Sequence, residues 1–391
     1  MHIDVNNAFL SWSAVKLLYD GYERDIRKIE AVIGGDEKAR HGIVLAKSPV
    51  AKARGVKTAE TLISARRKCK RLEVFPPNFK WYRFMSNKMF SLIRKYTPDI
   101  EILSIDECFL DYTKVQKLYG DPIKFAYHLK DEIYKTLKFT VNIGIANNKL
   151  CAKMASDFKK PNRVHTLFMH EIETKMFPLD VGDLYGVGKK TTAKLKELNI
   201  NTIYDLAHTN EEVLYKYFKN QASYLIEKAN GIDNSEVITY SIERKGISNS
   251  TTFSYNLIRL DDILNKLRVL TEKTCTSLRK QGKYAKVVGV TLRDKKFNNK
   301  SHQKKLLNAT NSTDDIYNVA CNLVKDIWDE EPIRLIRISL NGLTDNVNHQ
   351  ISLFENIISK DNDNKLDKVI DELKQQYGEK IINKASINNK K

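Results

Sequence analysis

The segment Ser104-Ile105-Asp106-Glu107-Cys108-Phe109-Leu110-Asp111 places two adjacent carboxylates between two apolar runs, as in a β-hairpin. Adjacent residues on a straight strand point to opposite faces, so Asp106 and Glu107 can share a ligand only if the chain bends there. Two carboxylates inside an apolar segment are costly unless they are paired or bind a metal ion. Taken alone, the segment leaves two interpretations open: a metal site, or one exposed acid beside one partnered acid.

A third acid near the start of the sequence favours the metal interpretation. Asp4 lies between Ile3 and Val5 on an apolar first strand, which we expect to be central in a sheet. Three carboxylates on neighbouring strands suit two Mg²⁺ ions about 3.5–4 Å apart, the arrangement that drives in-line phosphoryl transfer. The three acids therefore predict a catalytic site with two metal ions.

Strand-like and helix-like segments alternate over the first 165 residues, which predicts an α+β sheet domain with helices on one face. Residues 178–232 have a helical pattern with short glycine turns, residues 233–245 are polar, and a second α/β unit follows to about Leu343. The short β-branched runs of the first domain are Ala31–Ile33, Gly42–Leu45, Ile100–Ser104 and Thr140–Ile145.

The net charge of +18 indicates a polyanionic partner, either nucleic acid or an anionic membrane surface. Eleven Lys or Arg and one acid lie between Lys273 and Lys305, and this run overlaps the strand-like pattern Val287–Leu292. A sheet edged with cations suits a surface that follows phosphates, so we favour nucleic acid over a merely solvated face.

Cysteine spacing and apolar runs exclude several other classes. The five cysteines are widely spaced and form no C-x-x-C pair, which argues against a zinc site and a disulfide framework. No run of about 18 apolar residues occurs, so we expect no membrane span. The first residues do not resemble a signal peptide, and we expect a cytoplasmic protein.

Three further features suit a nucleotide substrate. Residues 51–57 present three cations near a glycine turn, which suits a triphosphate. A helix ends in Lys159 and Lys160 before Pro161; the helix dipole explains such lysines in part, and explains Lys159 better than Lys160. Phe9 lies on the first turn after the first strand, where an aromatic ring is more often part of the core.

In order and spacing, these segments resemble the Y-family DNA polymerases, in particular the bacterial polymerase IV and polymerase V catalytic-subunit groups. The resemblance covers roughly residues 1–345. The matching segments are Asp4–Phe9, Ala51–Val56, Ser104–Phe109, Gly144–Lys153, Lys160–Asn162 and Gly186–Gly188.

The resemblance implies a right-hand architecture with a ferredoxin-like palm, small fingers, a helical thumb with a helix-hairpin-helix, and an α/β little finger. The implied parts are the palm at 1–10 and 78–165, the fingers at 11–77, the thumb at 166–235, a linker at 236–245, the little finger at 246–345, and a flexible tail at 346–391 with a short helical pattern near 366–377.

The resemblance also implies roles for the acids. Asp4 and Asp106 would bridge both Mg²⁺ ions, and Glu107 would bind the ion that activates the primer 3′-hydroxyl. The backbone carbonyl of Val5 would complete the shell of the ion on the nucleotide side.

For the substrates, the resemblance assigns Phe9 as the steric gate that excludes a ribose 2′-hydroxyl, and Lys52 and Lys160 as triphosphate-binding cations. Pro49 stands where several members have a phosphate-contacting Tyr, which puts that contact in doubt. The expected DNA-binding residues are Gly186, Gly188 and Lys189 of the helix-hairpin-helix and Lys286, Arg293 and Lys295 of the little finger.

Residues 350–354, Gln350-Ile351-Ser352-Leu353-Phe354, resemble the Gln-x-x-Leu-Phe peptide with which bacterial polymerases bind the sliding clamp. Gln350 would open the motif, and Leu353 and Phe354 would be its apolar anchors. The alternative is a last piece of strand or helix that packs on the little finger.

The sequence thus predicts a monomeric, low-fidelity, template-directed DNA polymerase for translesion synthesis, without proofreading, acting on primer-template DNA and deoxynucleoside triphosphates. The alternatives are a non-catalytic DNA-binding repair accessory protein, a polymerase scaffold, or a nucleotide cyclase with a related palm. None of these explains the acids, the thumb and the basic unit together.

Overall fold

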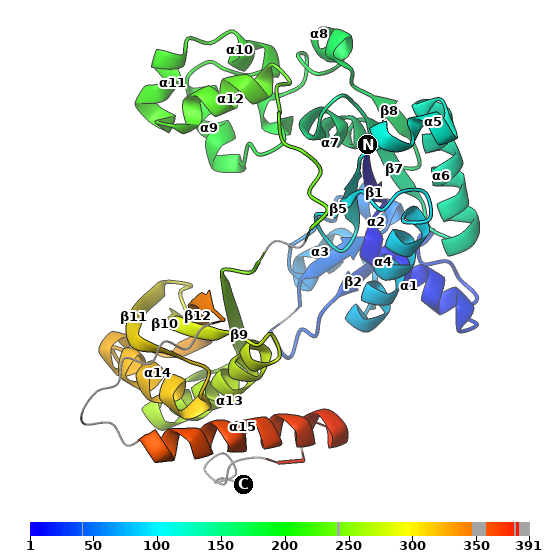
Figure 1. Ribbon diagram of the computed structural model, residues 1–391. Helices are drawn as coiled ribbons and strands as arrows, with labels where there is room; N and C mark the ends of the chain where they lie inside the picture. The colour runs from blue at the N-terminus through cyan, green and yellow to red at the C-terminus, as the bar shows by residue number, and fades with distance from the viewer. Residues whose placement is uncertain (41, 241–242, 346–356, 379–380, 383–391) are drawn as a thin grey trace. The chain divides into compact units, whose positions relative to one another are not determined.

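The computed structural model describes residues 1–40, 42–240, 243–345, 357–378 and 381–382 (Figure 1). The chain forms two compact units, Met1–Glu37 with His41–Ser241, and Lys38–Arg40 with Ile242–Lys391. The predicted clamp-binding residues Gln350, Leu353 and Phe354 lie outside the described residues. Within the described residues, no helix is long and apolar enough to cross a membrane.

The first unit is built on a five-stranded sheet of order β5-β6-β1-β7-β8. All neighbours are antiparallel except β7 and β8, which are parallel. The first strand of the chain is therefore central, as predicted. The strands are β1 (His2–Val5), β5 (Ile100–Ile102), β6 (Glu107–Leu110), β7 (Val141–Ile145) and β8 (Val164–Thr166).

Helices cover both faces of this sheet, so the prediction of helices on one face only is wrong. Ile3 and Val5 point into a core shared with α4 (Phe79–Ile93) and α6 (Pro122–Leu137). His2 points the other way, and its Nδ1 lies 2.8 Å from Ser156 Oγ of α7 (Lys149–Asp157). Alternation along β1 thus turns His2 and Asp4 toward α7.

The predicted fingers contain a smaller sheet of order β3-β2-β4. The strand predicted at residues 42–45 begins two residues later in the structure, as β3 (Val44–Lys47). Ser48 caps the next helix by accepting a hydrogen bond from the Ala51 amide at 3.0 Å, and Pro49 occupies the first turn, where a missing N–H costs nothing. The other elements are α1 (Ala8–Tyr19), β2 (Ala31–Gly34), α2 (Pro49–Ala53), α3 (Leu62–Lys68) and β4 (Glu73–Phe75).

The predicted thumb is helical and shares its core with the sheet domain. Leu150, Cys151 and Met154 of α7 belong to the apolar cluster of the thumb helices. Asn148 donates a hydrogen bond to the Gly231 carbonyl at 2.7 Å, which ties the end of the thumb to the start of α7. The remaining helices of this unit are α5 (Gln116–Tyr119), α8 (Ile172–Lys175), α9 (Lys189–Glu197), α10 (Ile203–Ala207), α11 (Glu211–Phe218) and α12 (Gln221–Ala229).

The second unit has a four-stranded antiparallel sheet of order β11-β10-β12-β9. Two helices, α13 and α14, pack on one face, and Val288, Val290 and Ile338 are among the strand residues buried beneath them. The elements are β9 (Gly246–Leu257), α13 (Leu260–Arg279), β10 (Tyr284–Asp294), β11 (Asn299–Thr310), α14 (Thr313–Ile327) and β12 (Ile333–Thr344).

A further helix, α15 (Ile357–Tyr377), lies where the sequence predicts a flexible tail. Asp367 and Asp371 accept from the buried Arg279 guanidinium of α13 at 3.0 and 2.6 Å. Asp367 also accepts from the Thr313 amide at the start of α14. The acids of the short helical pattern near 366–377 therefore meet a partner about 90 residues earlier in the chain, which periodicity alone does not reveal.

At Gly144 of β7, the backbone of α7 approaches the sheet closely. A Cβ there would lie 1.9 Å from the Ala152 carbonyl oxygen and 2.5 Å from the Ser156 amide. We expect Gly144→Ala to lower the free energy of unfolding of the first unit by about 3 kcal/mol, because helix or strand must shift. Denaturant unfolding measures this, with Gly188→Ala as the control, since a Cβ at Gly188 meets nothing within 4 Å. Equal stability of both variants would contradict the close approach.

Candidate active site

Strand pairing brings the three predicted acids to neighbouring positions. Asp4 of β1 lies directly opposite Glu107 of β6, and the Val5 amide donates to the Asp106 carbonyl at 3.0 Å. The chain bends just before β6, where the amides of Leu103 and Ser104 both donate to the Glu107 carbonyl. The expectation of a bend at this carboxylate pair is therefore confirmed.

Two lysines, Lys153 in the middle of α7 and Lys160 in the turn after it, meet these carboxylates. Lys160 Nζ lies 2.9 Å from Asp4 Oδ1. Lys153 Nζ donates to Glu107 and lies 3.9 Å from Asp4 Oδ2. Asp106 accepts instead from its neighbour Ser104 Oγ at 2.5 Å. In the part of the chain that the structure describes, no three His, Cys, Asp or Glu side chains are arranged to hold a metal ion.

Burial and charge act on these groups in opposite directions. Burial raises the pKa of Asp4, although Lys160 and Lys153 oppose the shift. Hydrogen bonds from His2 and Lys153 lower the pKa of Glu107 to about 2. Burial alone would lower the pKa of Lys160, but Asp4 and Asp157 outweigh it and the pKa is raised. The site therefore holds compensated charges, and a buried Asp4 carboxylate requires a cation nearby.

His2 is a further member of the site that the sequence analysis does not single out. Its ring is fully buried, with Nε2 3.3 Å from Glu107 Oε2 and Nδ1 2.8 Å from Ser156 Oγ. Its position two residues before Asp4 is the available signal, because residues at spacing two on a strand share a face.

A buried amide pair fixes the turn that carries Lys160. Asn6 donates to the Asn142 side chain at 3.1 Å and accepts from the Asn162 amide at 2.8 Å. Asn142 in turn donates to the carbonyls of Ser156 and Lys159, both at 3.0 Å. The turn is thereby held against β1 and β7, and Lys160 reaches Asp4 from a fixed backbone.

Phe9 lies at the start of α1, next to the end of β1. The centroid of its ring lies 5.0 Å from the ring centroid of Tyr82 and 6.1 Å from that of Phe79, both of α4. Tyr82 is fully buried, and its hydroxyl lies 2.7 Å from Ser13 Oγ. Tyr82 is thus a rigid support behind the predicted steric gate that the sequence analysis missed.

The second predicted triphosphate cation, Lys52, is exposed on α2. Burial, and after it the charge of Lys52, lowers the pKa of Lys47 at the end of β3. Lys47 Nζ donates to Thr58 Oγ1 at 2.8 Å. Pro49 starts α2, so the backbone at this position is the first turn of a helix.

The predicted helix-hairpin-helix has the backbone its sequence suggests. Gly186 adopts a φ of 95°, which favours glycine. Gly188 precedes α9, whose first residue is the exposed Lys189, and no side chain caps the helix start. Free amides at a helix N-terminus attract anions, phosphates included.

The four-stranded sheet of the second unit leaves one face, here called the open face, without helices. By strand register the open face consists of Gly246, Ser248, Ser250, Thr252, Val287, Gly289, Thr291, Arg293, Asn299, Ser301, Gln303, Lys305, Leu335, Arg337, Ser339 and Asn341.

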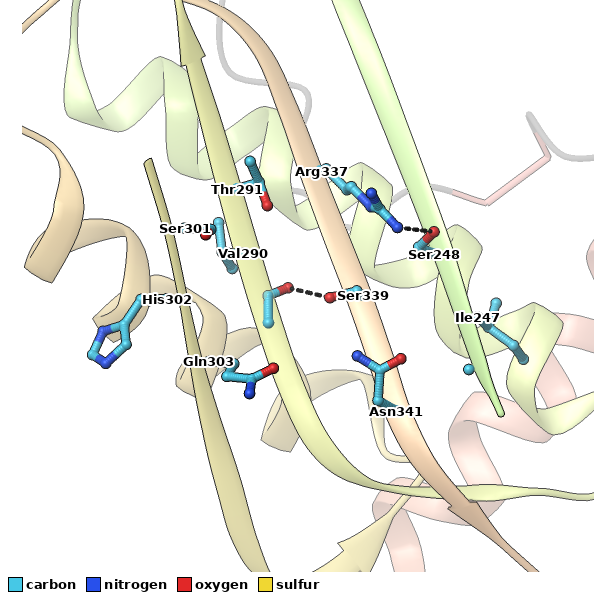
Figure 2. Close-up of a pocket in the computed structure, with 12 residues that line it drawn as sticks. Ile247, Ser248, Val290, Thr291, Ser301, His302, Gln303, Arg337, Ser339 and Asn341 are labelled. Carbon is cyan, nitrogen blue, oxygen red and sulfur yellow. Dashed lines mark hydrogen bonds between the residues drawn. The ribbon is translucent and has the colours of Figure 1, made fainter. Parts of the chain in front are cut away.

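A hollow of about 680 Å³ lies on the open face, and hydroxyl and amide side chains line much of it. Figure 2 shows Arg337 donating to Ser248 Oγ, at 3.0 Å, across two strands of this hollow. None of the open-face residues carries a carboxylate, and three carry a positive charge. Such a face suits a phosphate backbone.

The predicted DNA-binding cations of this unit are not all on the open face. Strand register places Arg293 there, whereas Lys286 lies at a bulge of β10 and Lys295 in the turn after it. Other members of the basic run serve the unit itself: Arg279 binds α15 and Lys300 pairs with Asp329. The polar alternation Arg337-x-Ser339-x-Asn341 was the overlooked signal of the open face.

The donor set at β1 and β6 fits a divalent cation in its chemistry. Asp4, Asp106 and Glu107 offer only oxygen ligands, as Mg²⁺ and similar hard cations prefer. Positive charge already lies at two of these carboxylates, because Lys153 reaches both Asp4 and Glu107 and Lys160 reaches Asp4. A metal ion bound there would therefore share its ligands with lysine ammonium groups.

Comparisons with known proteins match most of the chain. A model of the impB/mucB/samB family matches residues 3–157, a model of its C-terminal domain matches residues 244–353, and a model of the IMS family HHH motif matches residues 171–200. A curated protein of Clostridium acetobutylicum named DNA polymerase IV is 46% identical over 97% of this chain and 96% of its own length. One of Bacillus subtilis named DNA polymerase IV 1 is 33% identical over 98% and 92%.

Solved structures of Y-family DNA polymerases also resemble this chain. A chimera of the Y-family DNA polymerases Dbh and Dpo4 aligns with 88% of this chain and 99% of its own, with a TM-score of 0.77 and 25% identity. An insertion ternary complex of Dbh DNA polymerase aligns over 88% and 99%, with a TM-score of 0.58 and 25% identity.

Proposed function

The chain belongs to the Y family of translesion DNA polymerases and is a DNA-directed DNA polymerase, and from this premise we propose how its residues carry out synthesis. Polymerases of this family depend on divalent metal ions and act on DNA and nucleotides. We propose low-fidelity extension of a primer 3′-end across damaged template, with two Mg²⁺ ions and without proofreading.

The observation that carries this proposal is the register of β1 and β6. Asp4 faces Glu107 across the strand pair, and Asp106 follows the bend directly before Glu107. Asp4 and Asp106 would hold both ions. The carbonyl of Val5 would help to hold the ion on the nucleotide side, and Glu107 would hold the ion on the primer side. When bound, the ions lower the pKa of the primer hydroxyl and neutralise triphosphate charge.

The chain's own side chains would position the nucleotide. Lys160, on the turn held by the Asn6–Asn142 pair, and the exposed Lys52 would bind the triphosphate as point charges. The ring of Phe9, supported by Tyr82, would lie where a ribose 2′-hydroxyl must pass. Aligning the triphosphate with the primer hydroxyl is itself a large part of the rate enhancement.

The DNA would be held by two surfaces that read no bases. The amides around Gly186 and Gly188, with Lys189, would bind the backbone at the helix-hairpin-helix. The open face would follow a strand of the duplex through Arg293, Arg337 and its hydroxyl and amide groups. Phosphate contacts of this kind position the DNA without selecting its sequence, which suits a polymerase.

We further propose the division into palm (1–10, 78–165), fingers (11–77), thumb (166–235) and little finger (246–345), and a monomer that acts in the cytoplasm. Residues 350–354 would bind the replication sliding clamp. That assignment rests on the sequence resemblance of Gln350, Leu353 and Phe354 to clamp-binding peptides.

Asp106→Asn tests the catalytic assignment. We expect it to abolish extension of a labelled primer with Mg²⁺ and four deoxynucleotides, because a neutral amide is a poor metal ligand, while the Kd for primer-template DNA stays unchanged. Asp111→Asn is the matched control; Asp111 follows the same strand and accepts from the local Thr113 amide at 2.9 Å. Extension retained by Asp106→Asn would refute the metal role. Extension absent from the parent as well, with DNA still bound, would favour a scaffold or accessory protein.

Phe9→Ala tests the steric gate. Removing the ring should raise the ratio of ribonucleotide to deoxynucleotide kcat/KM by at least about 100-fold, since a clash is lost and no new contact with the deoxynucleotide is made. Phe9→Tyr keeps the ring and should keep the selectivity. A ratio unchanged in Phe9→Ala would remove Phe9 from sugar discrimination.

Arg337→Ala tests the open face. Loss of one phosphate contact should weaken DNA binding about three- to tenfold and reduce the slope of log K against log salt by about 1. Arg334→Ala, on the same strand, is the control, because its guanidinium stacks on Phe297 at 4.9 Å. Equal salt slopes for the two variants would argue against phosphate binding by Arg337.

A further inference from the structure

Lys153 occupies the space between two of the catalytic acids. It is 8% exposed and projects from α7, with Nζ donating to Glu107 and lying 3.9 Å from Asp4. Asp157 lies 3.9 Å from the same ammonium group, and the Tyr185 ring lies 5.9 Å away. Lys153 therefore touches both acids that β1 and β6 place opposite each other.

Ser156 and His2 hold Lys153 and Glu107 in place. Ser156 Oγ donates to the Lys153 carbonyl at 2.8 Å and also contacts His2 Nδ1. The other ring nitrogen of His2 faces Glu107 at 3.3 Å. The Glu107 carboxylate thus has two partners, His2 of β1 and Lys153 of α7, and both of these side chains are buried.

Lys160 and Lys153 differ in which carboxylates they can keep from a metal ion. It reaches Asp4 on the other carboxylate oxygen, Oδ1, pairs with Asp157 at 2.8 Å, and is exposed. Lys153 alone of the two meets Glu107. A carboxylate oxygen that holds an ammonium group is less available to a metal ion, and two cations held by one carboxylate repel each other.

We propose that Lys153 is a positioning residue that competes with the divalent cation for Asp4 and Glu107, and so sets the metal concentration at which these acids bind metal. The inference rests on the metal site proposed above. Before metal binds, Lys153 supplies positive charge to these two partly buried carboxylates. Asp157 and the Tyr185 ring offer the ammonium other partners when it is displaced.

Direct titration with Mn²⁺, without DNA or nucleotide, tests the competition by the electron paramagnetic resonance signal of free Mn²⁺. Lys153→Gln should bind Mn²⁺ about tenfold more tightly than the parent, because a positive charge next to the ligands is removed. In EDTA the same variant should unfold at a lower temperature than the parent. Added Mn²⁺ should remove this difference in unfolding temperature.

Lys149→Gln is the matched control. Lys149 lies one turn earlier on α7 and pairs with Glu101 at 2.7 Å, away from the catalytic acids, so its loss should leave Mn²⁺ affinity unchanged. Lys153→Met, which keeps the stem volume, provides a second neutral variant with the same expected shift if Lys153→Gln folds poorly.

Mn²⁺ affinity that is unchanged or weaker in both neutral variants, while Asp106→Asn loses binding, would overturn the competition and leave the metal site intact. A parent and neutral variants that all fail to bind Mn²⁺ would overturn the metal site and the competition together.

Discussion

The antiparallel pairing of β1 with β6 is the constraint on which the site depends. It sets Asp4 against Glu107, and the bend before β6 brings Asp106 beside them. A slip of one residue would turn His2 and Asp4 into the apolar core beneath α4 and α6 and turn Ile3 and Val5 toward α7 instead. The burial of Ile3 and Val5 therefore fixes the register, and the register places Asp4 opposite Glu107.

Three acids gathered on one sheet need compensating charge, and α7 supplies it. Gly144 lets this helix approach the sheet closely enough for Lys153 to reach both Asp4 and Glu107. The Asn6–Asn142 pair then holds the following turn, from which Lys160 returns to Asp4. The packing that makes the helix part of the core thus also determines which cations meet the acids.

In the second unit, the two faces of one sheet differ in character, and the proposed DNA contacts lie on one of them. Its covered face is an ordinary apolar core beneath α13 and α14. Its open face alternates with that core along the same strands, so buried Val290 and Ile338 are followed by Thr291 and Ser339 on the open face. Several cations of this unit are used within it: Arg279 holds α15, and Lys300 pairs with Asp329. Net charge alone therefore overstates how many basic side chains can meet phosphate.

The sequence by itself determined the family, the α+β sheet domain, the central first strand and the three acids, because short motifs such as Ser104–Phe109 carry both strand propensity and chemistry. It also placed Phe9, Lys160 and the glycines of the helix-hairpin-helix. Only the tertiary structure decided that α7 covers the face carrying Asp4, that His2, Lys153 and Tyr82 belong to the site, and that Arg279 fixes α15. These contacts join residues far apart in the chain, such as the pair Lys153 and Glu107, and no local period records which distant side chain a buried charge will meet.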